Sequence, residues 1–142
     1  MASIELKELT FRYPGADEET LSPISLKIEN GEAFALLGAS GAGKTTILNL
    51  LSGLLIPSSG RIKFNGEDVT DWSGRNRNIA QVFQFPVVYE NLTIQENLSF
   101  PLRARKFKKS VIGQRVDLIA NELGITELLN LKAPQLSLFQ KQ

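Results

Sequence analysis

The sequence of 142 residues contains no cysteine and no histidine. Without cysteine, the chain can form neither a disulfide framework nor a thiolate metal site. Without histidine, it lacks the commonest general base and metal ligand of proteins. Any chemistry of this chain must therefore rest on other side chains or on the backbone.

Excess charge of one sign and long apolar runs are also missing. The 16 basic and 15 acidic residues give a net charge of +1, which offers no electrostatic reason to expect a nucleic-acid partner. No stretch approaches the roughly 20 apolar residues of a membrane span, and the first residues lack the basic and apolar regions of a signal peptide. We expect one compact cytosolic domain that reaches a membrane only through a partner.

A glycine-rich run is the most informative motif that the sequence does contain. It matches the pattern G-x-x-x-x-G-K-[ST] and comprises Gly38, Ala39, Ser40, Gly41, Ala42, Gly43, Lys44, Thr45 and Thr46. Loops of this pattern hold phosphate with backbone N–H groups, because glycine adopts backbone angles that other residues avoid. The dipole of the following helix adds positive charge. We expect Lys44 to contact the β- and γ-phosphates and the Thr45 hydroxyl to bind Mg²⁺.

The sequence on either side of this loop fits the same interpretation. Residues 33–37 form a continuous apolar run, typical of a strand buried on both faces. After the loop, apolar residues recur at helical spacing and predict a helix with one apolar face: Ile47, Leu48, Leu51, Leu54 and Leu55. A glycine-rich turn in an unrelated fold is the alternative, and the order of strand, loop and helix argues against it.

Further strands are predicted in the first half of the chain. Residues 4–13 alternate in part and suit an edge strand with one solvent face, and residues 24–28 alternate cleanly. Asn30-Gly31 predicts a hairpin turn that leads into the strand at 33–37. Residues 79–83 have the composition of another buried strand.

Helices are predicted in the second half. Thr93 and Glu96 have the spacing of a capping box, which predicts a helix that begins at Thr93 and runs towards Arg103. Ser110 is a candidate cap for a second helix, whose apolar face would hold Ile112, Val116, Ile119 and Leu123 and which Gly124 would end. A short third helix is expected between Thr126 and Leu131.

Residues outside the loop extend the motif to a known family. Tyr13 stands about 25 residues before Gly38, and Gln84 ends the predicted strand at 79–83. The stretches 81–84, 92–93, 96–98 and 100–103 follow in order. Together with the loop, these residues resemble the ATP-binding subunit of ABC transporters, in the branch that imports carbohydrates and polyols, including glycerol-type importers. The resemblance covers essentially the whole chain in one collinear order.

The resemblance implies a fold and a set of site residues. The fold is α/β: a P-loop NTPase (RecA-like) ABC ATPase core, here an N-terminal portion, with an antiparallel β part and a helical subdomain. We expect a β-rich nucleotide-binding part at 1–85 and the helical subdomain at 86–142. The implied cofactors are ATP and Mg²⁺, with Tyr13 stacked on adenine and with Thr45 and Gln84 on the metal. The alternatives are an exposed strand-end aromatic at Tyr13 and an ordinary polar strand end at Gln84.

The resemblance also implies partners. They are a second ABC ATPase subunit, in a homodimer or heterodimer, and transmembrane permease subunits that contact the 84–90 region. The protein would then be peripheral on the cytoplasmic face of the cell membrane, and in full length it would couple MgATP binding and hydrolysis to uptake of a sugar or polyol. The basic run 103–109 is expected to be a solvated loop between helices, with a membrane or partner contact as the alternative.

One departure from the family lies near residue 136. Leu136, Ser137 and Gln140 match the family's signature, usually L-S-G-G-Q, but Leu138 and Phe139 replace both glycines. In the family, backbone N–H groups of this segment contact the γ-phosphate of ATP that the opposite subunit holds, at a helix N-terminus. Large side chains would crowd that approach. We therefore expect a degenerate signature and a weakened partner ATP site.

A second departure concerns the catalytic residues. No acidic residue follows Glu127, and histidine is absent, so the family's Mg²⁺-binding aspartate, catalytic glutamate and switch histidine have no counterpart in these residues. Phosphoryl transfer to water depends on such positioning and charge neutralisation. We therefore expect the N-terminal portion of a longer ATPase, with no catalytic residue present. A nucleotide-binding fragment without hydrolytic activity and a non-transport ABC ATPase that acts on nucleic acid or ribosomes are the alternatives.

Overall fold

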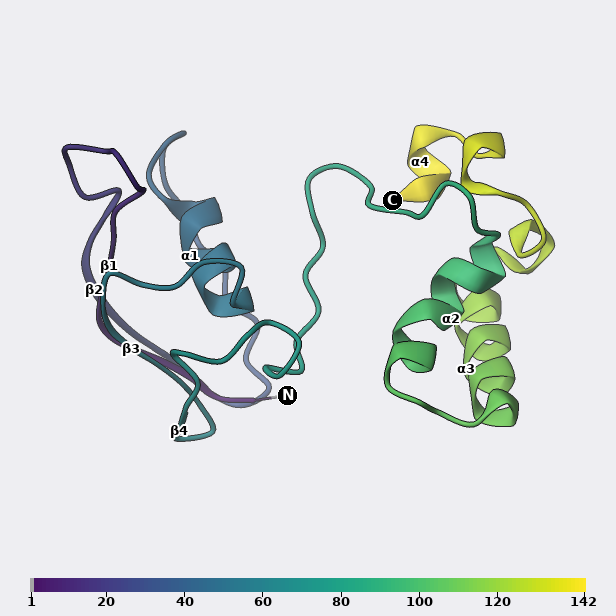
Figure 1. Ribbon diagram of the computed structural model, residues 1–142, viewed down its shortest axis with the longest axis horizontal. Helices are drawn as coiled ribbons and strands as arrows, with labels where there is room; N and C mark the ends of the chain where they lie inside the picture. The colour runs from purple at the N-terminus through teal and green to yellow at the C-terminus, as the bar shows by residue number, and fades with distance from the viewer. Residues whose placement is uncertain (1) are drawn as a thin grey trace. The chain divides into compact units, whose positions relative to one another are not determined.

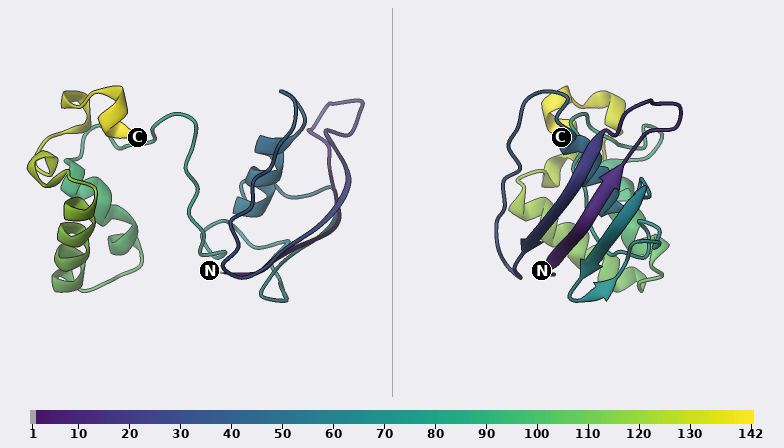
Figure 2. Two further views of the ribbon diagram at one scale, coloured as in Figure 1. Left: turned by 180° about the vertical axis from the view of Figure 1, so that it is seen from behind. Right: turned by 90° about the vertical axis from the view of Figure 1, so that its left-hand side faces the viewer.

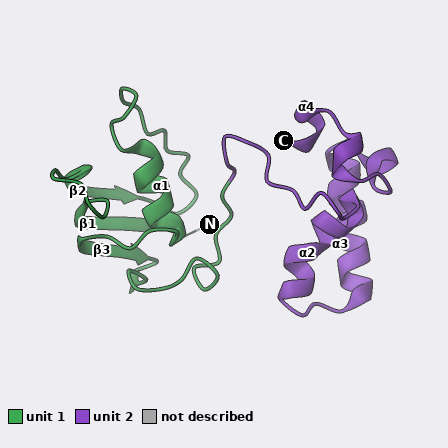
Figure 3. Cartoon of the chain, turned by 45° about the horizontal axis from the view of Figure 1, so that its top comes forward, with its two compact units in different colours: residues 1–81 green, residues 82–142 purple. Residues whose placement is uncertain are grey.

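The chain forms two compact units, residues 1–81 and 82–142 (Figure 3). The structure is a computed structural model that describes residues 2–142. Unit 1 holds an antiparallel sheet and one helix, and unit 2 holds the remaining helices. Among the residues that the structure describes, no helix is both long and apolar enough to cross a membrane.

A four-stranded antiparallel sheet with the order β2-β1-β3-β4 forms the base of unit 1 (Figures 1 and 2). Its strands are β1 (Ile4–Phe11), β2 (Leu21–Ile28), β3 (Ser59–Phe64) and β4 (Glu67–Asp68). β1 pairs with a strand on each side, so the predicted edge strand at 4–13 is a central strand. That prediction was wrong because alternation reports which face of a strand is buried and says nothing about how many neighbours the strand has.

Helix α1 (Lys44–Ser52) packs on one face of this sheet (Figure 1). Ile47 and Leu50 project from the helix into the main buried cluster, which also contains Leu6, Leu9, Phe11, Leu21, Ile62, Phe64 and Val69. The helix is shorter than predicted. Gly53 takes a left-handed conformation (φ 74) and its N–H bonds back to the helix, so the chain leaves the helix there. Leu54 and Leu55 consequently lie beyond it.

Residues 33–37 and 79–83 were both predicted as buried strands. Neither stretch forms a strand, and most of their residues are exposed. Leu37 is 88% exposed and Val82 is 84% exposed. The turn at Asn30-Gly31 is present, but the segment after it forms no hairpin. The prediction was wrong because an apolar run indicates only that a segment suits a buried strand. A strand also needs a hydrogen-bonding neighbour, and within residues 2–142 neither stretch has one.

Unit 2 is built on the antiparallel helices α2 (Ile94–Ala104) and α3 (Lys109–Glu122) (Figure 1). Two short 3₁₀ turns, η1 (Thr126–Leu128) and η2 (Ala133–Gln135), and the short helix α4 (Leu138–Lys141) follow. A second buried cluster holds them together and contains Ile94, Ile112, Val116, Ala120, Leu129 and Leu136. The third helix, expected between Thr126 and Leu131, is only the 3₁₀ turn η1.

The capping box predicts the start of α2 correctly, whereas the predicted start of α3 was wrong. Thr93 is the N-cap of α2, and its hydroxyl accepts from the Glu96 N–H at 3.2 Å. In α3, Lys108 occupies the N-cap position, so Ser110 lies inside the first turn. Lys106 has a left-handed backbone (φ 60) in the turn between α2 and α3, two residues before the N-cap Lys108. The buried face is also rotated towards Ala120, which leaves Ile119 and Leu123 exposed.

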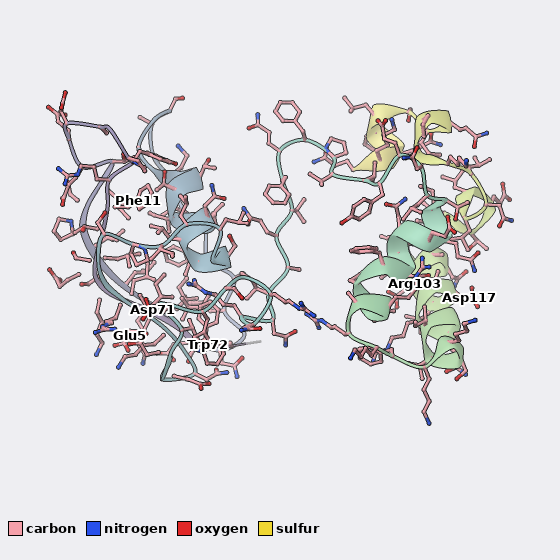
Figure 4. The ribbon with its side chains drawn as sticks, in the orientation of Figure 1. Glu5, Phe11, Asp71, Trp72, Arg103 and Asp117 are labelled. Atoms are coloured by element: carbon pink, nitrogen blue, oxygen red, sulfur yellow. The ribbon has the colours of Figure 1, made fainter. Side chains whose placement is uncertain are left out.

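The basic run 103–109 connects α2 to α3 and is exposed along its whole length. Arg103 belongs to α2 and Asp117 to α3, as labelled in Figure 4. Arg103 donates to the Glu96 carbonyl at 3.0 Å, and the Arg115 guanidinium lies 4.9 Å from the centre of the Phe107 ring. The expected exposure to solvent is confirmed, but only residues 105–108 form the loop, because the rest of the run belongs to α2 and α3.

The capping box makes the stability of α2 dependent on pH. The Glu96 carboxylate accepts the Thr93 N–H at 2.8 Å, and this hydrogen bond lowers the pKa of Glu96 from its ordinary value of 4.5. A lowered folded-state pKa means that the stabilisation is fully present above pH 4.5 and is lost as the pH falls through the folded-state value. We expect wild type to exceed Glu96→Gln in unfolding free energy at pH 7, with the difference shrinking at pH 3. Urea unfolding of both proteins measures this, and a difference independent of pH would contradict it.

Candidate functional site

The glycine-rich loop runs directly into α1 and leaves the start of that helix open. Gly43 is the N-cap with a left-handed backbone (φ 83), no side chain caps the helix, and the first turn holds no acidic residue. Within residues 2–142, the N–H groups of Lys44, Thr45 and Thr46 have no hydrogen-bond acceptor. Unpaired N–H groups at a helix start, together with the helix dipole, favour an anion. The backbone here fits a phosphate group.

Lys44 places its ammonium group at the same loop. Its Nζ donates to the Gly38 carbonyl at 2.8 Å and to the Ala39 carbonyl at 2.6 Å. The described ion pairs are Lys7–Glu5, Lys27–Glu29 and Arg61–Asp68, so no carboxylate neutralises Lys44. The charge is held in place by neutral carbonyls and is available to an anion.

Tyr13 lies against the start of α1. Its hydroxyl is 3.3 Å from the Thr46 hydroxyl, and its ring meets the Phe11 ring edge-on, with centres 4.8 Å apart. Thr46 is buried while Tyr13 is 41% exposed. The structure thus brings Tyr13 to the loop and leaves much of the side chain open to solvent. Its stacking on adenine stays a prediction.

The predicted Mg²⁺ ligands belong to different units. Thr45 is exposed in the first turn of α1, and Gln84 is exposed in unit 2. The described residues include no group of three or more acidic side chains that could hold a metal ion. Mg²⁺ in nucleotide sites is commonly held by one or two protein oxygens together with phosphate and water, and a hydroxyl and an amide oxygen fit that donor set. The assignment of Thr45 and Gln84 to the metal stays a prediction.

The signature-like segment forms its own small capping box. Ser137 is the N-cap of α4, its hydroxyl accepts from the Gln140 N–H at 3.2 Å, and the Gln140 side-chain oxygen accepts from the Ser137 N–H at 2.9 Å. Leu136 is buried in unit 2. The replacements for the family's glycines point outwards, and Phe139 is 91% exposed.

The sequence reasoning missed Arg77. This arginine is only 4% exposed, and its guanidinium donates to backbone carbonyls of α1 and of the segment after β4. Burial lowers its pKa. No sequence pattern could reveal it, because an arginine bonded to carbonyls needs no particular partner side chain.

Known proteins match this chain over most of its length. A family model described as "ABC transporter" matches residues 21–142. The trehalose import ATP-binding protein SugC of Mycobacterium tuberculosis is 39% identical over 142 residues, which cover 100% of this chain and 36% of that protein. The sn-glycerol-3-phosphate import ATP-binding protein UgpC of Chromobacterium violaceum is 37% identical over 142 residues, which cover 38% of its length.

A solved structure matches the fold. The chain of cbiO1 from Clostridium perfringens, described as part of the ABC transporter complex cbiONQ, matches with a TM-score of 0.83 and 30% identity. The match covers 97% of this chain and 57% of that one. The predicted fold class is confirmed. The chain spans 36% to 38% of the length of the two curated relatives.

The close packing of Gly43 provides a test of the loop. Gly43 and Gly31 both have φ 83, but a Cβ on Gly43 would lie 3.3 Å from the Thr20 carbonyl oxygen, whereas a Cβ on Gly31 would meet nothing within 4 Å. The left-handed backbone alone costs an alanine about 1 kcal/mol or more. We expect Gly31→Ala to show that loss and Gly43→Ala to lose measurably more in urea unfolding. Equal losses would show that the contact with Thr20 does not constrain the loop.

Proposed function

The chain belongs to the ABC transporter family, and we propose on this basis that it is the nucleotide-binding portion of an importer's ATPase subunit. The observation that carries the proposal is the open start of α1, where three unpaired N–H groups and the unneutralised Lys44 ammonium gather at one loop. A polyphosphate is the ligand whose charge and acceptor geometry suit that arrangement.

The ligand that we propose is MgATP. The N–H groups of the loop and of the first turn hold the phosphates, and Lys44 neutralises the charge at the β- and γ-phosphates. Thr45 and Gln84 supply oxygen ligands to Mg²⁺, and Tyr13 stacks on adenine. The edge contact of the Tyr13 ring with Phe11 and the contact of its hydroxyl with Thr46 support this role.

The proposal extends to the whole protein, of which these residues form one part. It dimerises with a second ATPase subunit, hydrolyses ATP and drives permease subunits from the cytoplasmic face of the membrane. The names of the two relatives as import ATP-binding proteins and the origin of the solved chain in a transporter complex support this. The 84–90 region is the proposed permease contact, and its exposed apolar residues Phe85 and Val87 support it. The proposed cargo is a sugar or polyol.

The signature-like segment is proposed to weaken the partner's ATP site. Leu138 and Phe139 stand where the family has glycines, and both are exposed. In the assembled full-length dimer, we expect Leu138→Gly with Phe139→Gly to raise the ATPase rate, because backbone N–H groups then approach the γ-phosphate freely. Steady-state phosphate release measures the rate. Full hydrolysis at both sites in the unchanged dimer would contradict this proposal.

MgATP binding by the chain tests the central proposal. We expect Lys44→Ala to weaken MgATP binding at least tenfold in isothermal titration calorimetry, because it removes a charge-assisted contact worth more than about 1.4 kcal/mol. Lys7→Ala is the matched control, since Lys7 lies on β1 and pairs with Glu5 at 3.3 Å, and it should bind as wild type does. Equal binding by wild type and Lys44→Ala would contradict the proposal.

A further inference from the structure

Helix α1 is fastened at the end opposite its proposed ligand. We propose that Arg77, assisted by Gln81, is a positioning residue for the nucleotide site: it clamps the C-terminal half of α1 and thereby sets the position of Lys44 and Thr45. The contacts of Arg77 lie within unit 1. Their expected effect on nucleotide binding rests on the proposed function.

The guanidinium of Arg77 bridges two segments through the backbone alone. Its Nη1 donates to the carbonyls of Leu50 and, at 3.0 Å, Leu51, which belong to the last turn of α1. Its Nη2 donates to the Thr70 carbonyl at 2.8 Å, and its Nε donates to the carbonyl of Trp72 (labelled in Figure 4) at 2.9 Å. One side chain therefore ties the end of α1 to the segment that follows β4.

The charge of Arg77 suits this position although no carboxylate pairs with it in the described chain. The last carbonyls of a helix carry the negative end of the helix dipole and have no partner within the helix. A buried cation that satisfies them is stabilised by charge-assisted hydrogen bonds. The planar fork of arginine spreads its N–H groups over three nitrogens and so reaches carbonyls of two separate segments, whereas a lysine has only one nitrogen.

Two further contacts hold the same segment to α1. The Gln81 amide nitrogen donates to the Asn49 side-chain oxygen at 3.1 Å. Gly53 and Gly74 pack backbone to backbone, because a Cβ on Gly53 would lie 2.7 Å from the Gly74 nitrogen. No side chain fits between these glycines. The segment 70–81 therefore contacts the end of α1 at several points.

Because α1 is rigid, holding its C-terminal end also limits the movement of its N-terminal end. The clamped carbonyls belong to Leu50 and Leu51, so Lys44 stands about 10 Å along the axis from the clamp, at 1.5 Å per residue. The helix transmits a displacement over that length because its hydrogen bonds make it stiff. Gln81 also stands three residues before Gln84 in the sequence. The clamp thus joins the helix that carries one proposed Mg²⁺ ligand to the segment 70–81, which precedes the other ligand in the sequence.

Substitution of Arg77 in the 142-residue chain tests the inference. We expect Arg77→Lys and Arg77→Met to weaken MgATP binding about tenfold in calorimetry performed below the unfolding temperature of each variant. Arg61→Met is the matched control, because Arg61 is an exposed arginine of the same unit that pairs with Asp68 at 3.4 Å. It should bind as wild type does. Unchanged affinity in folded Arg77 variants, whatever their thermal stability, would overturn the inference.

A readout without nucleotide separates this inference from the proposed function. The Ile47 N–H bonds to the Gly43 carbonyl at 2.9 Å and closes the first turn of α1. We expect its hydrogen exchange to be faster in the Arg77 variants and unchanged in Arg61→Met. If wild type fails to bind MgATP, the proposed function fails, and the exchange of Ile47 alone decides whether the clamp exists. Unchanged exchange contradicts it.

A milder variant covers the case in which Arg77→Met does not fold. Gln81→Leu removes only the bond to Asn49, and we expect about a threefold loss of MgATP affinity, as for the loss of one neutral hydrogen bond. Arg77→Lys together with Gln81→Leu then replaces Arg77→Met in both assays. Wild-type affinity and wild-type Ile47 exchange in that pair would overturn the inference.

Discussion

The attachment of helix α1 to the sheet and to Arg77 is the constraint on which the rest of unit 1 depends. One face of the helix is held by burial, since Ile47 and Leu50 belong to the main apolar cluster. The C-terminal end is held by charge, since the Arg77 guanidinium satisfies its last carbonyls. The N-terminal end is left open, and we propose that the ligand binds there. A helix fixed on one face and at one end presents the other end with little freedom, which is the condition for a preorganised anion site.

The open end of α1 differs from the starts of α2 and α4. Those two helices have side-chain caps from Thr93 and Ser137, each completed by a reciprocal bond three residues later. A side-chain oxygen there uses N–H groups that a ligand could otherwise take. At α1 the preceding residue is Gly43, which offers no such oxygen. Gly43 therefore leaves the first N–H groups of α1 free for the proposed phosphate ligand.

Sequence motifs correctly predicted features that depend on residues close together in the sequence. They failed for strands and for Arg77, which depend on contacts between residues far apart in the sequence. The loop at 38–46 and the capping box at Thr93 are local, and their predicted positions agree with the structure. The stretches 33–37 and 79–83 were predicted as strands on composition, but a strand exists only with a partner to pair with. No sequence pattern predicts the contacts of Arg77, because its hydrogen-bond acceptors are backbone carbonyls, which every residue has. The fold class followed from family resemblance, and the solved relative confirms it.

We propose that the open start of α1 receives the phosphates of MgATP. Amide resonances of Lys44, Thr45 and Thr46, followed by NMR during addition of MgATP, test it most directly, because these N–H groups have no acceptor in the described chain. We expect these amides to show the largest chemical-shift changes and to gain protection from hydrogen exchange as they bond to phosphate. The absence of any change at these amides, or changes confined to unit 2, would contradict it.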